Sequence, residues 1–189
     1  ILLESVRPWY EQIAGFGLGG AERGNPPTKF SSYFAQAQRL GFKTTIHAGE
    51  EGPVDYVKQG LHLLKVDRID HGNAALDDPE IMRYLAQTRI PLTLCPLSNL
   101  LLKVVPQLEQ HPLKKMLQAG LLVSINSDDP SYFGGYLARN WQACQQALEL
   151  SRSDLVQLAK NSFESAFLPA DKKKQYVAAV DDFVQHWQD

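Results

Sequence analysis

The sequence predicts an α/β fold, in which parallel strands alternate with helices that cover the sheet. Two observations carry this prediction. Short apolar, β-prone runs alternate with segments of helical periodicity about five times along the chain, which is the pattern of a parallel sheet. Polar residues gather at the carboxyl end of these runs, where parallel α/β folds bind their ligands. An open doubly wound sheet and a (β/α)8 barrel both satisfy this pattern.

The individual elements follow from apolar spacing and from end signals. Strands are predicted where β-prone runs end in glycine or polar residues, over 13–18, 43–46, 67–72, 90–95 and 121–127. Helices are predicted over 2–12, 28–40, 53–64, 78–88, 111–118, 136–150, 152–167 and 171–187. Thr28 is predicted to cap the second helix, and Gly41 to end it. Pro53 and Pro79 open two more helices, because proline is tolerated in a first helical turn.

The composition excludes several classes of protein. Of 189 residues, 44% are hydrophobic and 21% are charged, and the net charge of −2 provides no basic surface for nucleic acid. No apolar run reaches the roughly 18 residues of a membrane span, and no secretory signal is visible. Cys95 and Cys144 belong to no C-x-x-C pair, which excludes a thiolate zinc site and fits reduced thiols in a cytoplasmic protein. No G-x-G-x-x-G pattern follows a strand, which disfavours a dinucleotide cofactor.

The last predicted strand ends in two adjacent carboxylates, Asp128 and Asp129, followed by Pro130. Alternation along a strand places Ser124 and Asp128 on one face. Adjacent carboxylates repel each other unless a positive group lies between them, and a metal ion is the simplest such group. An Asx-turn followed by a helix cap explains the same residues, so this stretch alone leaves both interpretations open.

Other strand ends supply imidazole and carboxylate groups, namely His47 with Glu50 and Asp70 with His71. This combination suits a catalytic zinc or a related divalent ion, and a carboxylate beside the water of such a site is a ready proton shuttle. Structural alternatives stay open, because His47 is also explained as a hydrogen-bonded core residue and Asp70–His71 as a structural pair.

Further residues with reactive side chains have structural interpretations. Cys95 is predicted to be a small buried apolar residue. His62, His111 and His186 lie in or beside predicted helices and away from strand ends, so we predict surface or capping roles for them.

Four ordered motifs carry a resemblance to a known family: His47-Ala48-Gly49-Glu50, Arg68-Ile69-Asp70-His71-Gly72, Cys95-Pro96-Leu97-Ser98-Asn99 and Ser127-Asp128-Asp129-Pro130. In this order they resemble the adenosine/adenine deaminase family, which consists of zinc-dependent (β/α)8 barrels. The resemblance runs from about Gly15 to Asn140. Asp70 stands where adenosine deaminases usually have glycine, and the segments 24–30 and 132–136 also resemble the adenine-acting branch.

The resemblance implies a role for each strand-end residue. His47 and Asp128 would be ligands of one zinc ion per subunit. Glu50 would donate a proton to purine N1, which makes C6 more electrophilic. His71 would orient the nucleophile that attacks C6 and stabilise the charge that develops.

Substrate contacts are implied in the same way: Asp129 would hydrogen-bond N7, and the backbone of Gly20 would meet N3. The implied reaction is hydrolysis of adenine to hypoxanthine and ammonia in purine salvage. The expected partner is a small-molecule purine, with no nucleic acid and no membrane. Adenosine as substrate is the nearest alternative, and an inactive barrel that serves as a binding protein is the remote one.

The family's His-x-His pair and its first three strands have no counterpart in the sequence. Residues 1–189 are therefore expected to form a single incomplete domain, the C-terminal part of a barrel, and the start at Ile1 inside a helix-like segment agrees with this. Open sheet edges expose apolar surface and unpaired backbone groups. We expect the segment alone neither to close a barrel nor to deaminate, and to bind zinc weakly at most.

Overall fold

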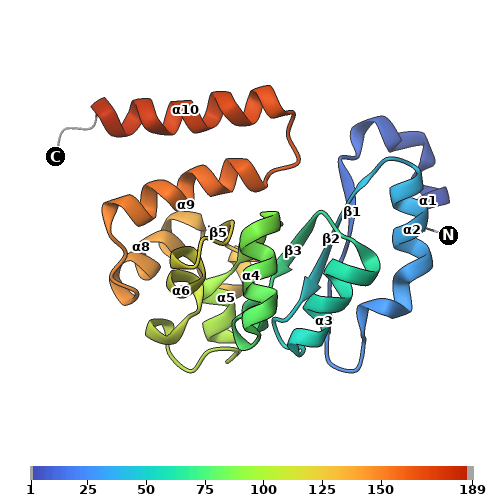
Figure 1. Cartoon of the computed structure of the whole chain (residues 1–189), viewed down its shortest axis with the longest axis horizontal. Coiled ribbons are helices and arrows are strands. Elements are labelled where there is room, and N and C mark those ends of the chain that lie inside the picture. Colours follow the sequence, from blue (N-terminus) through green and yellow to red (C-terminus); the bar gives the residue numbers. More distant parts are fainter. Residues whose placement is uncertain (1, 187–189) are drawn as a thin grey trace.

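A computed structural model describes residues 2–186 of the chain, and its centre is a sheet of five strands in the order β1-β2-β3-β4-β5. All neighbouring strands are parallel, which confirms the predicted α/β fold (Figure 1). The strands are β1 (Gly15–Leu18), β2 (Lys43–Ala48), β3 (Arg68–His71), β4 (Leu92–Leu94) and β5 (Val123–Ile125).

Helical segments connect the strands and follow the last of them. They include α2 (Ser31–Arg39), α3 (Val54–Lys58), η3 (Gln59–Leu64), α4 (Pro79–Thr88), α6 (Leu113–Gln118), α8 (Leu137–Ala147), α9 (Arg152–Ser165) and α10 (Ala170–His186). Short turns of helix complete the chain: α1 (Leu2–Ser5), η1 (Arg7–Gln12), η2 (Pro27–Phe30), η4 (Asn73–Asp77), α5 (Pro96–Leu101), η5 (Leu108–Gln110) and α7 (Pro130–Phe133).

The structure corrects three helix predictions. The helix expected over 2–12 is two short pieces, because Pro8 lies where the second piece begins and cannot continue an α-helix from the first. Thr28 lies inside η2 and does not cap α2, which starts at Ser31. The short helix α5 was not predicted. The last helix was expected to reach position 187, which lies outside the described residues.

One face of the sheet carries a row of apolar side chains, and the other face carries polar side chains. On one face, a row of buried apolar residues lies in register across the strands: Ile46, Ile69, Leu92 and Val123. Gly60 of η3 faces this row, since a Cβ there would lie 2.5 Å from Ile46 Cδ1. On the other face, His47 pairs in register with Asp70, and Asp70 with Thr93. Period-two alternation along each strand separates the two rows, so polar groups collect on one side of the sheet.

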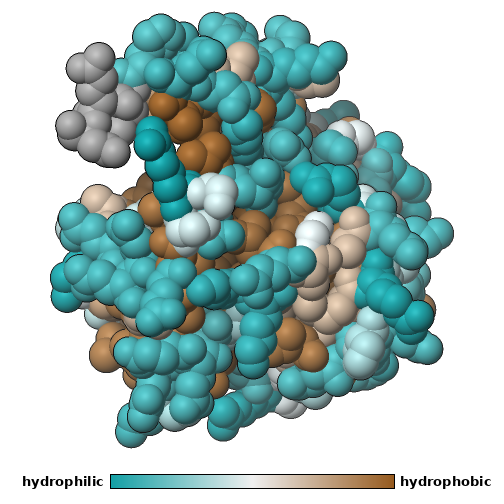
Figure 2. Space-filling model, turned by 60° about the vertical axis from the view of Figure 1, so that its left-hand side comes forward, coloured by the Kyte–Doolittle hydropathy of each residue, from teal (hydrophilic) through white to brown (hydrophobic). Residues whose placement is uncertain are grey.

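The last helix, α10, lies outside the layers formed by the sheet and its covering helices, and packs on α9 (Figure 1). Phe163 stacks on Tyr176 with ring centroids 5.0 Å apart. None of the residues of α10 is buried, and Figure 2 shows apolar surface in the hollow between α10 and the rest of the molecule. No helix within residues 2–186 is long and apolar enough to cross a lipid bilayer.

Asn161 joins α9 to the edge strand β5. Its Nδ2 donates to the carbonyl of Val123 at 2.9 Å, and its side chain is buried. We expect Asn161→Leu to lower the free energy of unfolding by about 1–3 kcal/mol, because it leaves this carbonyl buried without its donor. Urea denaturation measures the change. The control is Gln87→Leu, which makes a similar amide-to-leucine change at an exposed position of α4; a surface change of this kind costs about 0.5 kcal/mol or less. Equal losses in the two variants would contradict the role of Asn161.

Candidate active site

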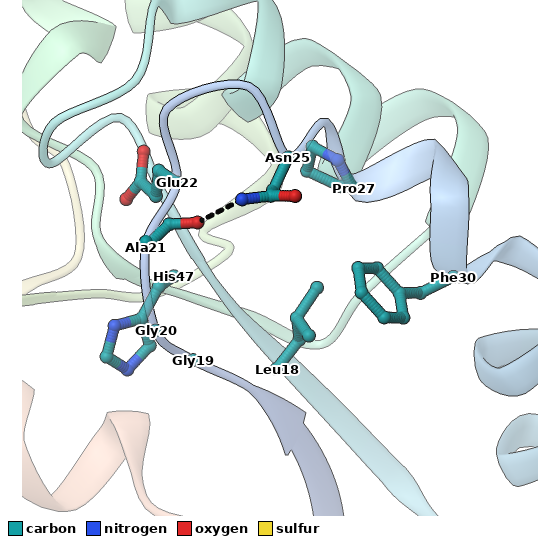
Figure 3. A pocket seen from close by; sticks show the side chains of 9 residues that line it. All are labelled: Leu18, Gly19, Gly20, Ala21, Glu22, Asn25, Pro27, Phe30 and His47. Atoms are coloured by element: carbon teal, nitrogen blue, oxygen red, sulfur yellow. Dashed lines mark hydrogen bonds between the residues drawn. The ribbon is translucent and has the colours of Figure 1, made fainter.

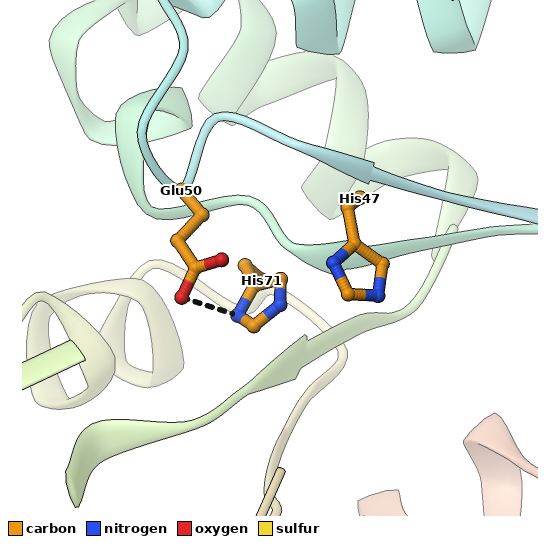
Figure 4. Close-up of side chains that lie close together, drawn as sticks. All are labelled: His47, Glu50 and His71. Carbon is orange, nitrogen blue, oxygen red and sulfur yellow. Dashed lines mark ion pairs between the residues drawn. The ribbon is translucent and has the colours of Figure 1, made fainter. Parts of the chain in front are cut away.

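The carboxyl ends of β2 and β3 bring His47, Glu50 and His71 together, as Figure 4 shows. The rings of His47 and His71 meet edge to face with centroids 4.6 Å apart. One potential ligand atom from each of the three side chains lies within 4.8 Å of the others. His71, Cys95 and Asp128 form a second set with the same property. Four of the sequence-predicted residues (His47, Glu50, His71 and Asp128) are therefore parts of these two overlapping sets.

Sharp backbone turns at the strand ends produce this convergence. His71 and Asp128 both have left-handed backbone conformations, with φ of 64° and 54°, and Gly49 between His47 and Glu50 has φ of 74°. Residues with side chains are uncommon in this region, and such strained positions concentrate at functional sites.

His71 is buried, and its Nδ1 forms no hydrogen bond with the described residues. This atom lies 3.3 Å from Oε1 of Glu50. Burial, and then the neighbouring His47, lower the pKa of His71 to about 4. The ring is therefore a neutral imidazole at physiological pH, with a nitrogen lone pair available to a ligand.

The Glu50 carboxyl lies in a site that favours its protonated form. Burial, followed by the charges of Asp128 and Glu22, raises its pKa to about 7, although a hydrogen bond from Asn99 acts in the opposite direction. A carboxyl group with a pKa near neutrality can hold and release a proton at the pH of the cell.

Glu22 fixes the backbone of the loop that carries Glu50. Its buried carboxylate accepts three backbone N–H groups: those of Gly49 at 2.9 Å, Glu50 at 3.1 Å and Gly52 at 2.8 Å. Glu22 is not among the site residues predicted from the sequence. The available signal was an acid two residues after the Gly19–Gly20 pair that follows the first strand.

Asp128 and Asp129 differ in their surroundings. Oδ2 of Asp128 accepts a hydrogen bond of 2.7 Å from the hydroxyl of Ser98 in α5. Asp129 is exposed and precedes α7, but its side chain makes no capping hydrogen bond. This overturns the helix-cap interpretation for Asp129. The strand also ends earlier than predicted, at Ile125, so the turn at Asp128, rather than strand alternation, directs its side chain.

A cavity of about 250 Å³ lies beside His47, and its wall includes the backbone of Gly19 and Gly20 (Figure 3). Leu18 and Phe30 provide apolar surface on another side. A Cβ at Gly19 would lie 3.2 Å from Nε2 of His47. The absence of a side chain therefore keeps the space next to the imidazole open.

The remaining predictions have mixed outcomes. Asp70 does not pair with His71; it accepts hydrogen bonds from Thr45, Thr93 and Arg68 on the polar face of the sheet. Cys95 is buried as predicted, and burial raises the pKa of its thiol.

The three other histidines also differ in outcome. His62 and His186 are exposed as predicted. His111 was expected at the surface or in a cap. It is buried, and its Nδ1 accepts the Leu113 N–H at the start of α6, so the capping role is confirmed and the surface location is wrong.

The donor atoms fit a zinc-type metal site. Neutral imidazole and carboxylate are ligands that Zn²⁺ prefers, and catalytic zinc sites combine them with an open position. The buried Nδ1 of His71 without a hydrogen bond and the grouping of His47, Glu50 and Asp128 around it are what such an ion requires.

Parallel strands whose carboxyl ends carry imidazoles and carboxylates are typical of metal-dependent hydrolases built on α/β barrels. A sequence profile of the adenosine deaminase family matches residues 3–183. The chain belongs to the adenosine deaminase family.

Individual relatives agree with this assignment. The chain is 52% identical over 184 residues to an adenine deaminase of Rhodopseudomonas palustris, covering 97% of this chain and 54% of the relative. The crystal structure of adenine deaminase from Arthrobacter aurescens superimposes with a TM-score of 0.94 at 41% identity, over 97% of this chain and 56% of that one. A zinc-bound amidohydrolase from Burkhoderia ambifaria gives a TM-score of 0.91 at 28% identity, over 97% and 52% of the two chains. The chain thus spans about half the length of the relatives it matches.

Proposed function

We propose that the full-length protein carrying this chain hydrolyses adenine to hypoxanthine and ammonia. The observation that carries the proposal is the Glu50 carboxyl, which has a pKa raised to about 7 and lies beside His47 and His71. The 52% identity to an adenine deaminase supports adenine as the purine.

His47 and Asp128 would hold a zinc ion, together with ligands from outside this chain. Zinc bound here would supply Lewis acidity and lower the pKa of a water molecule to about 7. Residues of this chain supply the proton and orient the water. Glu50 donates a proton to ring N1, which draws electrons from C6. The neutral His71 imidazole orients the water that attacks C6 and stabilises the charge that develops there.

Substrate contacts come from two strand ends. The backbone N–H of Gly20, in the wall of the cavity, donates to ring N3. The carboxylate of Asp129 accepts a hydrogen bond from N7–H of the adenine tautomer that carries its ring proton on N7. Addition of water at C6 and loss of the amino group as ammonia leave hypoxanthine, so that one water is consumed for each amine released.

Adenosine is the second candidate substrate, because the matching profile describes adenosine deaminase. The two substrates differ in the ribose, and the Asp70 side chain is a feature of the adenine-acting branch. Asp70 is anchored by Thr45 and Thr93 beside the site rather than in it. Asp70 would therefore affect the choice of substrate only indirectly, by holding the neighbouring side chains of the polar face in place.

The test is ammonia release from adenine and adenosine by the full-length protein with zinc supplied. We expect kcat/KM for adenine to exceed that for adenosine by about 100-fold or more, because a site for the free base would bury ribose hydroxyl groups without hydrogen-bond partners. A preference for adenosine would overturn the choice of substrate and leave the roles of Glu50 and His71 in place. Activity on neither, with zinc bound, would overturn the proposal.

A further inference from the structure

Three polar side chains without a role in the reaction above are buried behind Glu50: Asn73, Asn99 and His111, which are 8%, 0% and 2% exposed. Burying so many polar groups is costly unless they hydrogen-bond one another. They come from η4, α5 and the residue before Pro112, which are separate segments. Asn73 and His111 both contact Asn99, which in turn contacts the Glu50 carboxyl, and this arrangement requires an explanation.

The hydrogen bonds of this network have only one consistent direction. The Leu113 N–H donates to Nδ1 of His111 at 3.2 Å, so the ring proton of the neutral imidazole must be on Nε2. His111 Nε2 lies 3.1 Å from Oδ1 of Asn99, and Nδ2 of Asn73 donates to the same oxygen at 2.8 Å. With two donors facing its oxygen, Asn99 must turn its NH₂ group toward Glu50, where Nδ2 donates to Oε1 at 2.8 Å.

Oε1 of Glu50 therefore accepts a hydrogen bond from the Asn99 amide, which is 2.8 Å long. A carboxyl oxygen that accepts a hydrogen bond is a poor place for the acidic proton. The proton consequently resides on Oε2, to which Asn99 does not donate.

We propose that Asn99, with its amide fixed by His111, is a positioning residue that sets the direction of the Glu50 carboxyl and keeps its proton on Oε2. This inference rests on the proposed role of Glu50 as proton donor. Proton transfer depends steeply on the alignment of donor and acceptor, and a displacement of 1 Å can cost about 100-fold in rate. The network thus connects a buried histidine, remote from the substrate, to the rate of the chemical step.

His111 also caps α6, so the test must separate positioning from structure. Glutamine places an amide N–H near the position of Nε2 and retains the donation to Asn99. Asparagine places its carbonyl oxygen near the position of Nδ1, which retains the cap and loses the donation. His111→Gln therefore keeps the hydrogen bond to Asn99 and loses the cap, whereas His111→Asn keeps the cap and loses that hydrogen bond.

We expect His111→Asn to lower kcat of the full-length protein about 10- to 100-fold, with KM, zinc content and melting temperature close to the wild type. His111→Gln should retain kcat within about threefold, even if its melting temperature falls through the weaker cap. Equal kcat values in the two variants, or a larger loss in His111→Gln, would overturn the proposal, because kcat would then follow the cap.

A second measurement needs no turnover. Nitrogen-15 NMR of the wild-type histidine rings should show His111 protonated on Nε2 and unprotonated on Nδ1. A proton on Nδ1, or a charged ring at neutral pH, would overturn the network. If the wild-type protein deaminates no aminopurine, the proposed function fails, whereas the position of the His111 proton still decides whether the network exists.

Discussion

Glu50→Gln is expected to lower kcat for adenine by about 10²- to 10⁴-fold while zinc stays bound. This range is what a general acid contributes. Glutamine has nearly the shape of glutamic acid and still accepts the hydrogen bond from Asn99, which is 2.8 Å long in the wild type. It cannot release a proton to ring N1. The loss should therefore appear in kcat, with KM changed by only a few fold.

The adjacent Glu51 offers a matched control, because it is exposed whereas the Glu50 side chain is only 10% exposed. Glu51→Gln removes the same formal charge from the same loop and should retain kcat within about threefold. Zinc content is measured on both variants. Loss of zinc from Glu50→Gln in parallel with activity would contradict the proton-donor role and make Glu50 a metal ligand, which its place beside His47 and His71 also allows.

The sheet could be predicted from the sequence because its strands are buried on the helix side. Ile46, Ile69, Leu92 and Val123 all lie in β-prone runs, and each is fully buried in the register row that faces the helices. A residue in such a row must be apolar whatever its partner is, so each strand contains its own signal. The order of strands then follows from the short connections between them.

Helix boundaries were harder to predict where a proline can either end a strand or begin a helix. Pro96 directly follows the fourth predicted strand, over 90–95, whose end a proline explains, but proline is equally suited to a first helical turn, and α5 begins there. This short helix matters for the site, because it carries both Ser98, which contacts Asp128, and Asn99, which contacts Glu50.

The strand-end residues of the site could be predicted, whereas their supporting residues could not. His47, Glu50 and His71 lie at or just after the carboxyl end of a strand, and parallel strands bring such positions to one edge. Glu22, Asn99 and His111 act through hydrogen bonds that span long separations, for instance 49 residues between Asn99 and Glu50. No local pattern marks an asparagine or histidine whose partner is chosen by tertiary packing, so His111 was predicted at a helix end and its buried contact with Asn99 was missed.

Asp128→Asn is expected to remove the metal first and activity with it. Asparagine suits the position, since the left-handed conformation of residue 128, with φ of 54°, is accessible to asparagine and strained for alanine. The hydroxyl of Ser98 also keeps an oxygen acceptor. The fold should therefore persist while the ligand loses its negative charge. Substitutions in the surroundings of zinc ligands already cost 10- to 100-fold in metal affinity, so we expect a loss of about 100-fold or more, measured by competition with a chelator.

Asp129→Asn is the matched control, because it removes the same charge one residue away from a side chain that is exposed. It should keep zinc and raise KM for adenine, as expected of a residue that contacts N7. Equal zinc loss in the two variants would show that net charge at the strand end, rather than coordination, holds the ion. Unchanged zinc affinity in Asp128→Asn would remove Asp128 from the ligand set. The candidates from this chain would then be His47, Glu50 and His71, which already lie close enough to share an ion.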